Sequence, residues 1–129
     1  MRILVTGSRD WTDVQAIEQA LYEVTHDHEG FHCGLSVVVV HGNCRGADAI
    51  AGGAAHLCAR ANTEAHPAEN HGSWPSCGPR RNAHMVSLGA DICLAFPMPG
   101  SKGTWDLIRK AADEGIPVRI FPGRKEVKG

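Results

Sequence analysis

Apolar residues gather in short continuous runs along the chain, and polar turns that contain glycine separate these runs. Residues 2–6, 35–40 and 90–96 form clear runs, and residues 63–66 and 116–121 form weaker ones. A run without alternation is typical of a parallel strand that is buried on both faces. The pattern therefore predicts a mostly parallel sheet of about five strands.

Between these runs, apolar residues recur at the spacing of an α-helix. Residues 12–15 fit a capping box with Thr12 as the cap, and the helical pattern follows them to about residue 24. Further helices are predicted over residues 47–60, 80–88 and 103–114. Because strands and helices alternate, the chain is predicted to be an α/β domain with helices on both faces of the sheet.

Two stretches follow neither pattern. Residues 26–34 are polar and contain glycine, which predicts a loop. Residues 67–79 contain three prolines and two glycines, and an irregular stretch of that length is usually functional or mobile. The sequence leaves open whether it closes over a site. Residues 1–121 are expected to form one domain, with a charged C-terminal tail over residues 122–129.

Overall charge and composition limit the classes of partner. The formal net charge is −1 and no basic stripe is present, which argues against nucleic acid and anionic membranes. No signal peptide or membrane-length apolar segment is visible. The five cysteines lack paired spacing, which favours free thiols in a reducing compartment. We therefore expect a cytoplasmic protein that binds neither membrane nor nucleic acid.

Three turns that contain glycine follow predicted strands, at residues 7–11, 41–48 and 97–104. The carboxyl ends of parallel strands meet at one edge of a sheet, where α/β domains bind their ligands. The third turn leads into a helix at Gly103, whose free N–H groups and positive dipole favour an anion. Basic residues lie in or beside these turns: Arg9, Arg45, Arg80, Arg81 and Lys102. This convergence predicts a pocket for an anionic ligand.

The eight histidines also raise the question of a metal site. Two groups are close in sequence, and neither has the paired spacing of a structural zinc site. We therefore predict no metal site and no bound cofactor. The groups are His26, His28, His32 and Cys33, and His66, His71, Cys77 and His84.

Four short motifs occur in an order that resembles the SLOG superfamily, and most closely its small YspA-like proteins of bacteria and phages. Together they span nearly the whole chain. The motifs are Gly7-Ser8-Arg9-Asp10-Trp11, His41-Gly42-Asn43-Cys44-Arg45-Gly46-Ala47-Asp48, Arg81-Asn82-Ala83-His84-Met85 and Pro99-Gly100-Ser101-Lys102-Gly103-Thr104. The resemblance implies a Rossmann-like three-layer sandwich, a nucleotide or nucleotide-derived ligand, and a homo-oligomer.

The resemblance extends to the LOG enzymes of this superfamily, which cleave the N-glycosidic bond of nucleoside 5′-monophosphates. Their signature is Arg-Lys-x-x-Met followed by Pro-Gly-Gly-x-Gly-Thr-x-x-Glu. This chain has Asn82 in place of the lysine and Ser101 in place of a glycine. The position of the catalytic glutamate is Leu107, which carries no acid or base. Phosphate and ribose binding remain implied, whereas hydrolysis is left open.

Two functions follow as alternatives: a sensor or binding protein for a nucleotide-like ligand, or a phosphoribohydrolase that cleaves a nucleoside 5′-monophosphate. Trp11 or Trp74 could stack on a base, although either could equally pack in the core. An enzyme would need Asp48 or Asp106 as its acid or base; Asp48 could instead simply stabilise a helix N-terminus. The candidate ligand-binding residues are Gly7, Ser8, Arg9, Gly42, Arg45, Gly46, Arg81, Asn82, Pro99, Gly100, Ser101, Lys102, Gly103 and Thr104.

Overall fold

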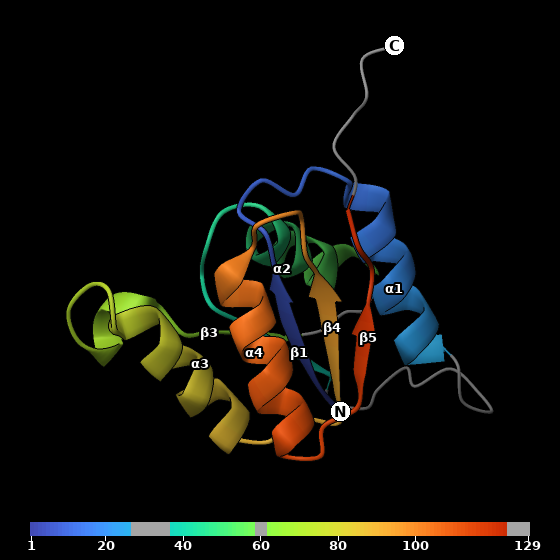
Figure 1. Cartoon of the computed structure of the whole chain (residues 1–129). Helices are drawn as coiled ribbons and strands as arrows, with labels where there is room; N and C mark the ends of the chain where they lie inside the picture. Colours follow the sequence, from blue (N-terminus) through green and yellow to red (C-terminus); the bar gives the residue numbers. More distant parts are fainter. Residues whose placement is uncertain (27–36, 59–61, 124–129) are drawn as a thin grey trace, which may run out of the picture.

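The computed structural model describes residues 1–26, 37–58 and 62–123. Five parallel strands form one sheet in the order β3-β2-β1-β4-β5 (Figure 1), so the predicted parallel sheet is confirmed. The strands are β1 (Arg2–Gly7), β2 (Val38–His41), β3 (Asn62–Ala65), β4 (Ile92–Phe96) and β5 (Val118–Ile120). Most of the predicted 26–34 loop and most of the C-terminal tail lie outside the described residues.

Helices cover both faces of the sheet, as the alternation of elements predicts. Helices α1 and α2 lie on one face and α3 and α4 on the other (Figure 1). No helix in the described part of the chain is long and apolar enough to cross a membrane. The bounds are α1 (Val14–His26), α2 (Ala47–Cys58), α3 (Cys77–Ser87) and α4 (Lys102–Asp113), with a short 3-10 helix η1 (Ala68–His71) before α3.

The central strand β1 contributes to two separate hydrophobic clusters. Ile3 and Val5 point into the cluster beneath α1 and α2, whereas Leu4 points into the cluster beneath α3 and α4. All three side chains are completely buried. Because successive residues of a strand face opposite sides, a strand covered on both sides must be apolar throughout.

Three helices begin at positions that differ from the sequence-based boundaries, and one of them, α4, begins at Lys102 rather than at residue 103. The cap of α1 is Asp13 rather than Thr12, because the Asp13 Oδ1 accepts the N–H of Ala16 at 3.1 Å. Helix α3 begins at Cys77 rather than at residue 80. Pro79 is tolerated there because a helix does not use the N–H groups of its first turn.

The order of the strands opens a crevice at one edge of the sheet. From β1 the chain continues to β2 and β3 on one side, and then returns to place β4 and β5 on the other. Connections from the carboxyl ends of β1 and β4 therefore leave toward opposite faces, and ligands of open α/β sheets bind at such a point. The turn after β1 and the turn after β4 form the two sides of this crevice.

Candidate functional site

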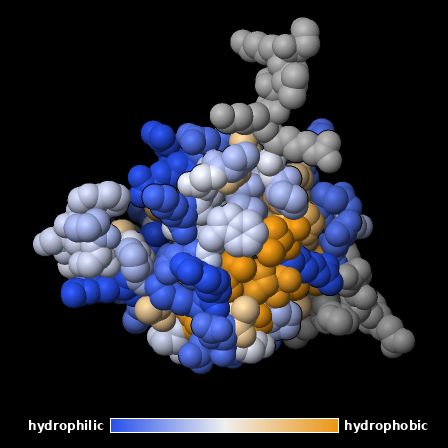
Figure 2. Space-filling model, in the orientation of Figure 1, coloured by the Kyte–Doolittle hydropathy of each residue, from blue (hydrophilic) through white to orange (hydrophobic). Residues whose placement is uncertain are grey.

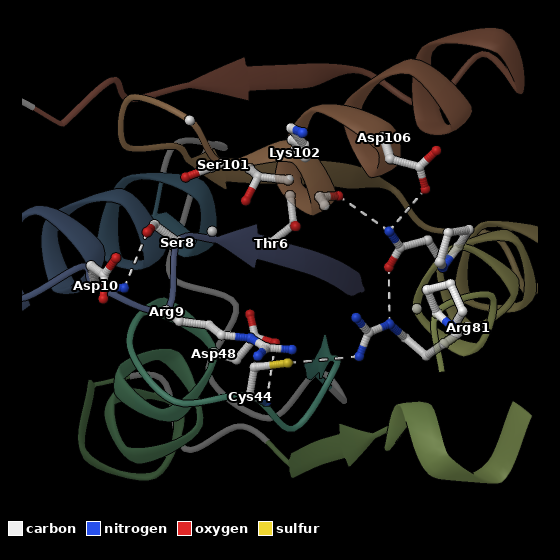
Figure 3. A pocket seen from close by; sticks show the side chains of 18 of the residues that line it. Thr6, Ser8, Arg9, Asp10, Cys44, Asp48, Arg81, Ser101, Lys102 and Asp106 are labelled. Atoms are coloured by element: carbon white, nitrogen blue, oxygen red, sulfur yellow. Dashed lines mark hydrogen bonds between the residues drawn. The ribbon is translucent and has the colours of Figure 1, made fainter. Parts of the chain in front are cut away.

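A cavity of about 680 Å³ occupies this crevice (Figure 3). Its walls come from the turns after β1, β2 and β4 and from the first turns of α3 and α4. Four residues of the 67–79 stretch also line it: Trp74, Pro75, Gly78 and Pro79. This stretch therefore forms part of one wall of the cavity.

The turn between β4 and α4 presents backbone donors to the cavity. Gly100 has a φ of +87°, a conformation that favours glycine. The Ser101 Oγ accepts the N–H of Met98 at 3.0 Å, which fixes the turn. The first N–H groups of a helix have no partner inside it, and those of Gly103 and Thr104 find none elsewhere in the described part of the chain. The helix therefore offers unpaired donors at the position that suits a phosphate.

Arg81 carries a buried positive charge on the opposite wall. Its guanidinium donates from Nη1 to the Gly42 carbonyl oxygen at 2.7 Å and from Nε to Asn82 Oδ1 at 2.9 Å. No carboxylate lies within ion-pair distance of it among the described residues. Because an unpaired buried charge is costly, Arg81 is a position where a bound anion would be stabilised.

Asn82 connects Arg81 to the start of α4. Its amide nitrogen donates to the Gly103 carbonyl oxygen at 3.2 Å and to Asp106 Oδ2 at 3.1 Å. Its Oδ1 accepts from Arg81, so the amide is satisfied on both sides. Asn82 thus orients the guanidinium relative to the helix N-terminus, a role that a lysine could not fill because it has no acceptor.

Asp48 stands at the start of α2 and faces the cavity (Figure 3). Its Oδ2 accepts the N–H of Gly42 at 3.0 Å and that of Cys44 at 3.4 Å, whereas its buried Oδ1 has no hydrogen-bond partner among the residues that the structure describes. Burial raises the pKa of Asp48 from 3.8 to about 6, against the opposing influence of these N–H groups and of nearby Arg81. The carboxyl group therefore has a free oxygen and titrates near neutral pH.

Asp106 differs from Asp48 in its surroundings. Lys110 donates to its Oδ2 at 2.6 Å, and an Arg109 nitrogen lies 3.7 Å from its Oδ1. Burial alone would raise the pKa of Asp106, but the hydrogen bonds from Lys110 and Asn82 and the two positive charges hold it below its usual value. This carboxylate stays ionised at neutral pH, which suits an anchoring role better than proton transfer.

The charges around the cavity do not balance. Of its carboxylates, Asp10 pairs with Arg45 at 3.7 Å and Asp106 pairs with Lys110 and Arg109. Arg9, Arg81 and Lys102 line the same cavity and form no ion pair with any described residue. Figure 3 shows the Arg9 side chain reaching toward Asp48, whose pKa its charge lowers. Four basic side chains line the cavity, Arg9, Arg81, Lys102 and Arg109, against three carboxylates, Asp10, Asp48 and Asp106, so positive charge is in excess.

The structure brings together most of the candidate residues and leaves three outside the cavity. The cavity is lined by Asp48, Asp106 and every ligand-binding candidate except Gly42, Arg45 and Gly46. Gly42 lies behind it, where a Cβ would collide with the Arg81 Nη1. Gly46, with a φ of +74°, lets the start of α2 approach the Ser8 carbonyl oxygen. Arg45 is exposed and paired with Asp10.

Two further residues have a structural role. Trp11 is buried in the core, where its ring packs edge-on against Phe96 at 5.3 Å, so it is not available to stack on a base. Leu107 is completely buried in the cluster beneath α3 and α4. The position of the LOG glutamate is therefore part of the hydrophobic core and faces away from the cavity.

Sequence reasoning missed several residues that line the cavity. Thr6 precedes the selected turn by one residue, and Arg109 is i+3 from Asp106, so helical spacing could have identified it. Asp10 and Cys44 lie inside two of the motifs given above but are not among the candidate residues. Only the three-dimensional path of the chain identifies the others. The missed residues are Thr6, Asp10, Cys44, Pro75, Gly78, Pro79 and Arg109.

Comparison with known proteins gives three findings. Residues 1–71 match the sequence family described as "YspA, cpYpsA-related SLOG family". The Gene 61 protein of Mycobacterium phage D29 is 39% identical over 124 residues, which cover 93% of this chain and 95% of that protein. The C-terminal domain of a hydrogenase from Pyrococcus furiosus is similar in structure, with a TM-score of 0.47 and 13% sequence identity. The superposition covers 92% of this chain and 89% of the hydrogenase domain.

Proposed function

The chain belongs to the YspA, cpYpsA-related SLOG family, and from this premise we propose that it binds a nucleotide or nucleotide-derived ligand in the cavity between β1 and β4. Membership in this family suggests a nucleotide-related ligand in general terms. The observation that carries the proposal is that Arg9, Arg81 and Lys102 line one cavity and form no ion pair with any described residue. The protein acts in this proposal as a sensor or binding protein.

A phosphate group would lie between the start of α4 and Arg81. The free N–H groups of Gly103 and Thr104 supply backbone donors, and the helix dipole adds a partial positive charge. Arg81 supplies a charge-assisted contact from the opposite wall. The buried Thr104 adds a hydroxyl group beside these donors.

The remainder of the ligand would extend toward Asp48 and Trp74. Asp48 lines the cavity, and its carboxyl group can accept a hydrogen bond from a ribose hydroxyl group. Trp74 lines the same cavity with 80% of its surface exposed, so a base can stack on its ring. A cavity of about 680 Å³ is within the range that holds ligands of this size.

An N-glycosidic hydrolase is the second candidate, and one observation favours it. Asp48 is a buried carboxyl group in the cavity with a pKa of about 6, which is near the value that general acid–base catalysis requires at neutral pH. In this scheme Arg81 holds a nucleoside 5′-monophosphate, water adds to C1′ as the bond from C1′ to the base breaks, and Asp48 is the general acid or base that moves the proton. Asp106, which Lys110 keeps ionised, would only help to position the substrate.

Ligand-observed proton NMR distinguishes the two candidates in one experiment. The purified protein is mixed with nucleoside monophosphates, nucleoside diphosphates and ADP-ribose, and saturation transfer and free-base signals are followed for several hours. Saturation transfer without free base supports a binding protein. Free base that forms with the unaltered chain but not with the Asp48→Asn variant supports the hydrolase.

A full absence of transfer across this panel would contradict the proposal, provided that the protein is folded. The Arg80→Ala variant serves as a matched control for Arg81→Ala. Arg80 is the adjacent residue of α3, is exposed and does not line the cavity. Transfer that survives in Arg80→Ala and disappears in Arg81→Ala would locate the binding in this cavity.

A further inference from the structure

Three histidines converge outside the nucleotide cavity. His66 follows β3, His71 ends η1 and His84 lies on α3. One ring nitrogen of each lies within 4.8 Å of the others. The His84 ring centroid is 5.4 Å from that of His66 and 4.9 Å from that of His71. None of the three lines the cavity described above.

Their spacing is close to what a tetrahedral ion requires. Zn–N bonds of about 2.0–2.1 Å place two ligand nitrogens about 3.3 Å apart. Modest rotations of the rings would therefore bring the three nitrogens onto one ion. His84 is exposed, so its ring can rotate at little cost.

A carboxylate supports one of the three rings. The Nε2 of His66 lies 3.0 Å from Glu64 Oε2, which leaves Nδ1 of the same ring to face a metal. Glu64 is itself held by Arg2, whose Nη2 donates to Oε2 at 2.7 Å. A histidine that binds a metal usually donates its other N–H to a carboxylate in this way.

The other two rings are free to bind an ion. No described residue forms a hydrogen bond with a ring nitrogen of His71 or His84. Three imidazole ligands suit zinc, copper, cobalt or nickel ions rather than Mg²⁺ or Ca²⁺, which prefer oxygen. Because His84 is exposed, a water molecule can complete the coordination.

We propose that His66, His71 and His84 form a binding site for a divalent transition-metal ion such as Zn²⁺, with water as the fourth ligand. The spacing of these histidines along the chain is not that of a structural zinc site, so a metal site is not expected from the sequence. The fold instead assembles them from three elements. The proposal is independent of the proposed nucleotide ligand, because the two sites share no lining residue.

The position of the site gives the ion a structural task. It would connect the end of β3 and η1 to the middle of α3. The chain between His71 and α3 contains Trp74 and Pro75, which line the nucleotide cavity. The ion would therefore link this wall of the cavity to α3 and restrict its movement.

Isothermal titration of the full chain with Zn²⁺, in the presence of a phosphine reductant, tests the site. We expect one ion per chain, and we expect His71→Gln and His84→Gln each to weaken binding at least about tenfold. The double variant His28→Gln/His32→Gln is the control, because it removes two histidines from a different part of the chain. Its affinity should match that of the unaltered chain.

Cobalt provides a second, spectroscopic measurement. Co²⁺ should give the visible bands of a tetrahedral nitrogen site without the near-ultraviolet band of a thiolate, and His84→Gln should lose them. Zn²⁺ should raise the melting temperature of the unaltered chain but not that of His84→Gln, whose fold is checked by circular dichroism. Unchanged affinity in both single variants, or a loss confined to the control, would overturn the proposal.

Discussion

At the scale of single residues, Arg81 is the side chain on which ligand binding should depend most. It is 9% exposed, and Gly42 and Asn82 hold it in place without neutralising its charge. We expect Arg81→Ala to weaken the binding of a phosphate-containing ligand by about 1.5–3 kcal/mol, the value of a hydrogen bond to a charged group. Calorimetric titration with the best ligand from the NMR panel measures this loss.

Arg81→Lys is the informative companion variant. It keeps the positive charge but loses the planar fork that bonds to both Gly42 and Asn82. Affinity between those of the unaltered chain and Arg81→Ala is therefore expected. If all three proteins bind the ligand equally, Arg81 does not contact it.

Asp48 should leave a signature in the pH dependence of stability. Its pKa is higher in the folded protein, at about 6, than its ordinary 3.8. The folded protein thus holds the proton more tightly, and this stabilisation is complete below pH 3.8 and lost as the pH rises through about 6. The contribution is about 3 kcal/mol at most, since one pKa unit corresponds to about 1.36 kcal/mol.

Urea denaturation of the unaltered chain and of Asp48→Asn at several pH values isolates this contribution. Other titrating groups are common to both proteins and cancel in the difference. The unfolding free energy of the unaltered chain should fall relative to that of Asp48→Asn between about pH 4 and 6, and then level off. Parallel pH profiles would mean that Asp48 does not hold its proton as the buried site implies.

At the scale of elements, the N-terminus of α4 can be tested through Lys102. This exposed residue is the first of the helix and lines the cavity. Lys102→Glu places a negative charge at the positive end of the dipole, which should stabilise the fold by less than the ~0.3–1 kcal/mol of the dipole alone, because Asp106 at i+4 repels the new charge. The same change should weaken a phosphate ligand through repulsion.

Lys102→Glu is thus expected to raise the stability of the fold and to lower its affinity for a phosphate ligand. Thermal denaturation measures the gain in stability, and ligand titration measures the loss in affinity. Lys102→Gln, which removes the charge without reversing it, should give smaller changes in both measurements. A variant that loses stability and affinity together would indicate damage to the turn rather than an electrostatic effect.

The strands were largely predictable from the sequence, because a strand that is buried on both faces requires an uninterrupted run of apolar residues. Val39 and Val40 are buried on opposite faces of the sheet, so an uninterrupted apolar run had to identify β2. Helix starts were harder to predict. Asp13 and Thr12 are both good caps, and only the geometry of the turn decides that Asp13 accepts the hydrogen bond.

The candidate site was predictable where it is made of turns, and less so where it is made of contacts distant in sequence. Arg81 could be selected from its motif, but its hydrogen bond to Gly42 joins residues 39 positions apart. The three histidines show the same limit: spacing along the chain did not indicate that η1 folds back against α3. The glycines predicted to bind the ligand are of two kinds. Gly7, Gly100 and Gly103 line the cavity, whereas Gly42 and Gly46 lie behind it and leave room for neighbouring backbone and side chains.

At the scale of the whole molecule, an apolar area supports the expectation of a homo-oligomer. Figure 2 shows it next to α4 and over β5. Trp105 of α4 and Ile120 of β5 remain 44% and 42% exposed, although both are large apolar residues. Such surfaces often mark contacts between proteins. We expect the protein to self-associate and Trp105→Glu to produce a monomer.

Multi-angle light scattering at micromolar protein concentration measures the mass directly. Tyr22→Glu is a matched control, because Tyr22 is 52% exposed and lies on α1, across the sheet from α4. This variant should keep the mass of the unaltered protein. A monomeric unaltered chain would end the expectation of an oligomer.

The cavity lies where the two sides of the sheet meet, and this has a consequence for how the protein unfolds. Asp48 belongs to the layer of α2, whereas Arg81 and Thr104 belong to the layer of α3 and α4. A bound ligand would therefore add a further connection between two layers that the sheet and the hydrogen bond from Arg81 to the Gly42 carbonyl oxygen already join. At a hundredfold excess over its dissociation constant, it adds about 2.7 kcal/mol to the stability of the folded state. Amide hydrogens in α2 and α3 that exchange independently in the free protein would then exchange together, as one cooperative unit.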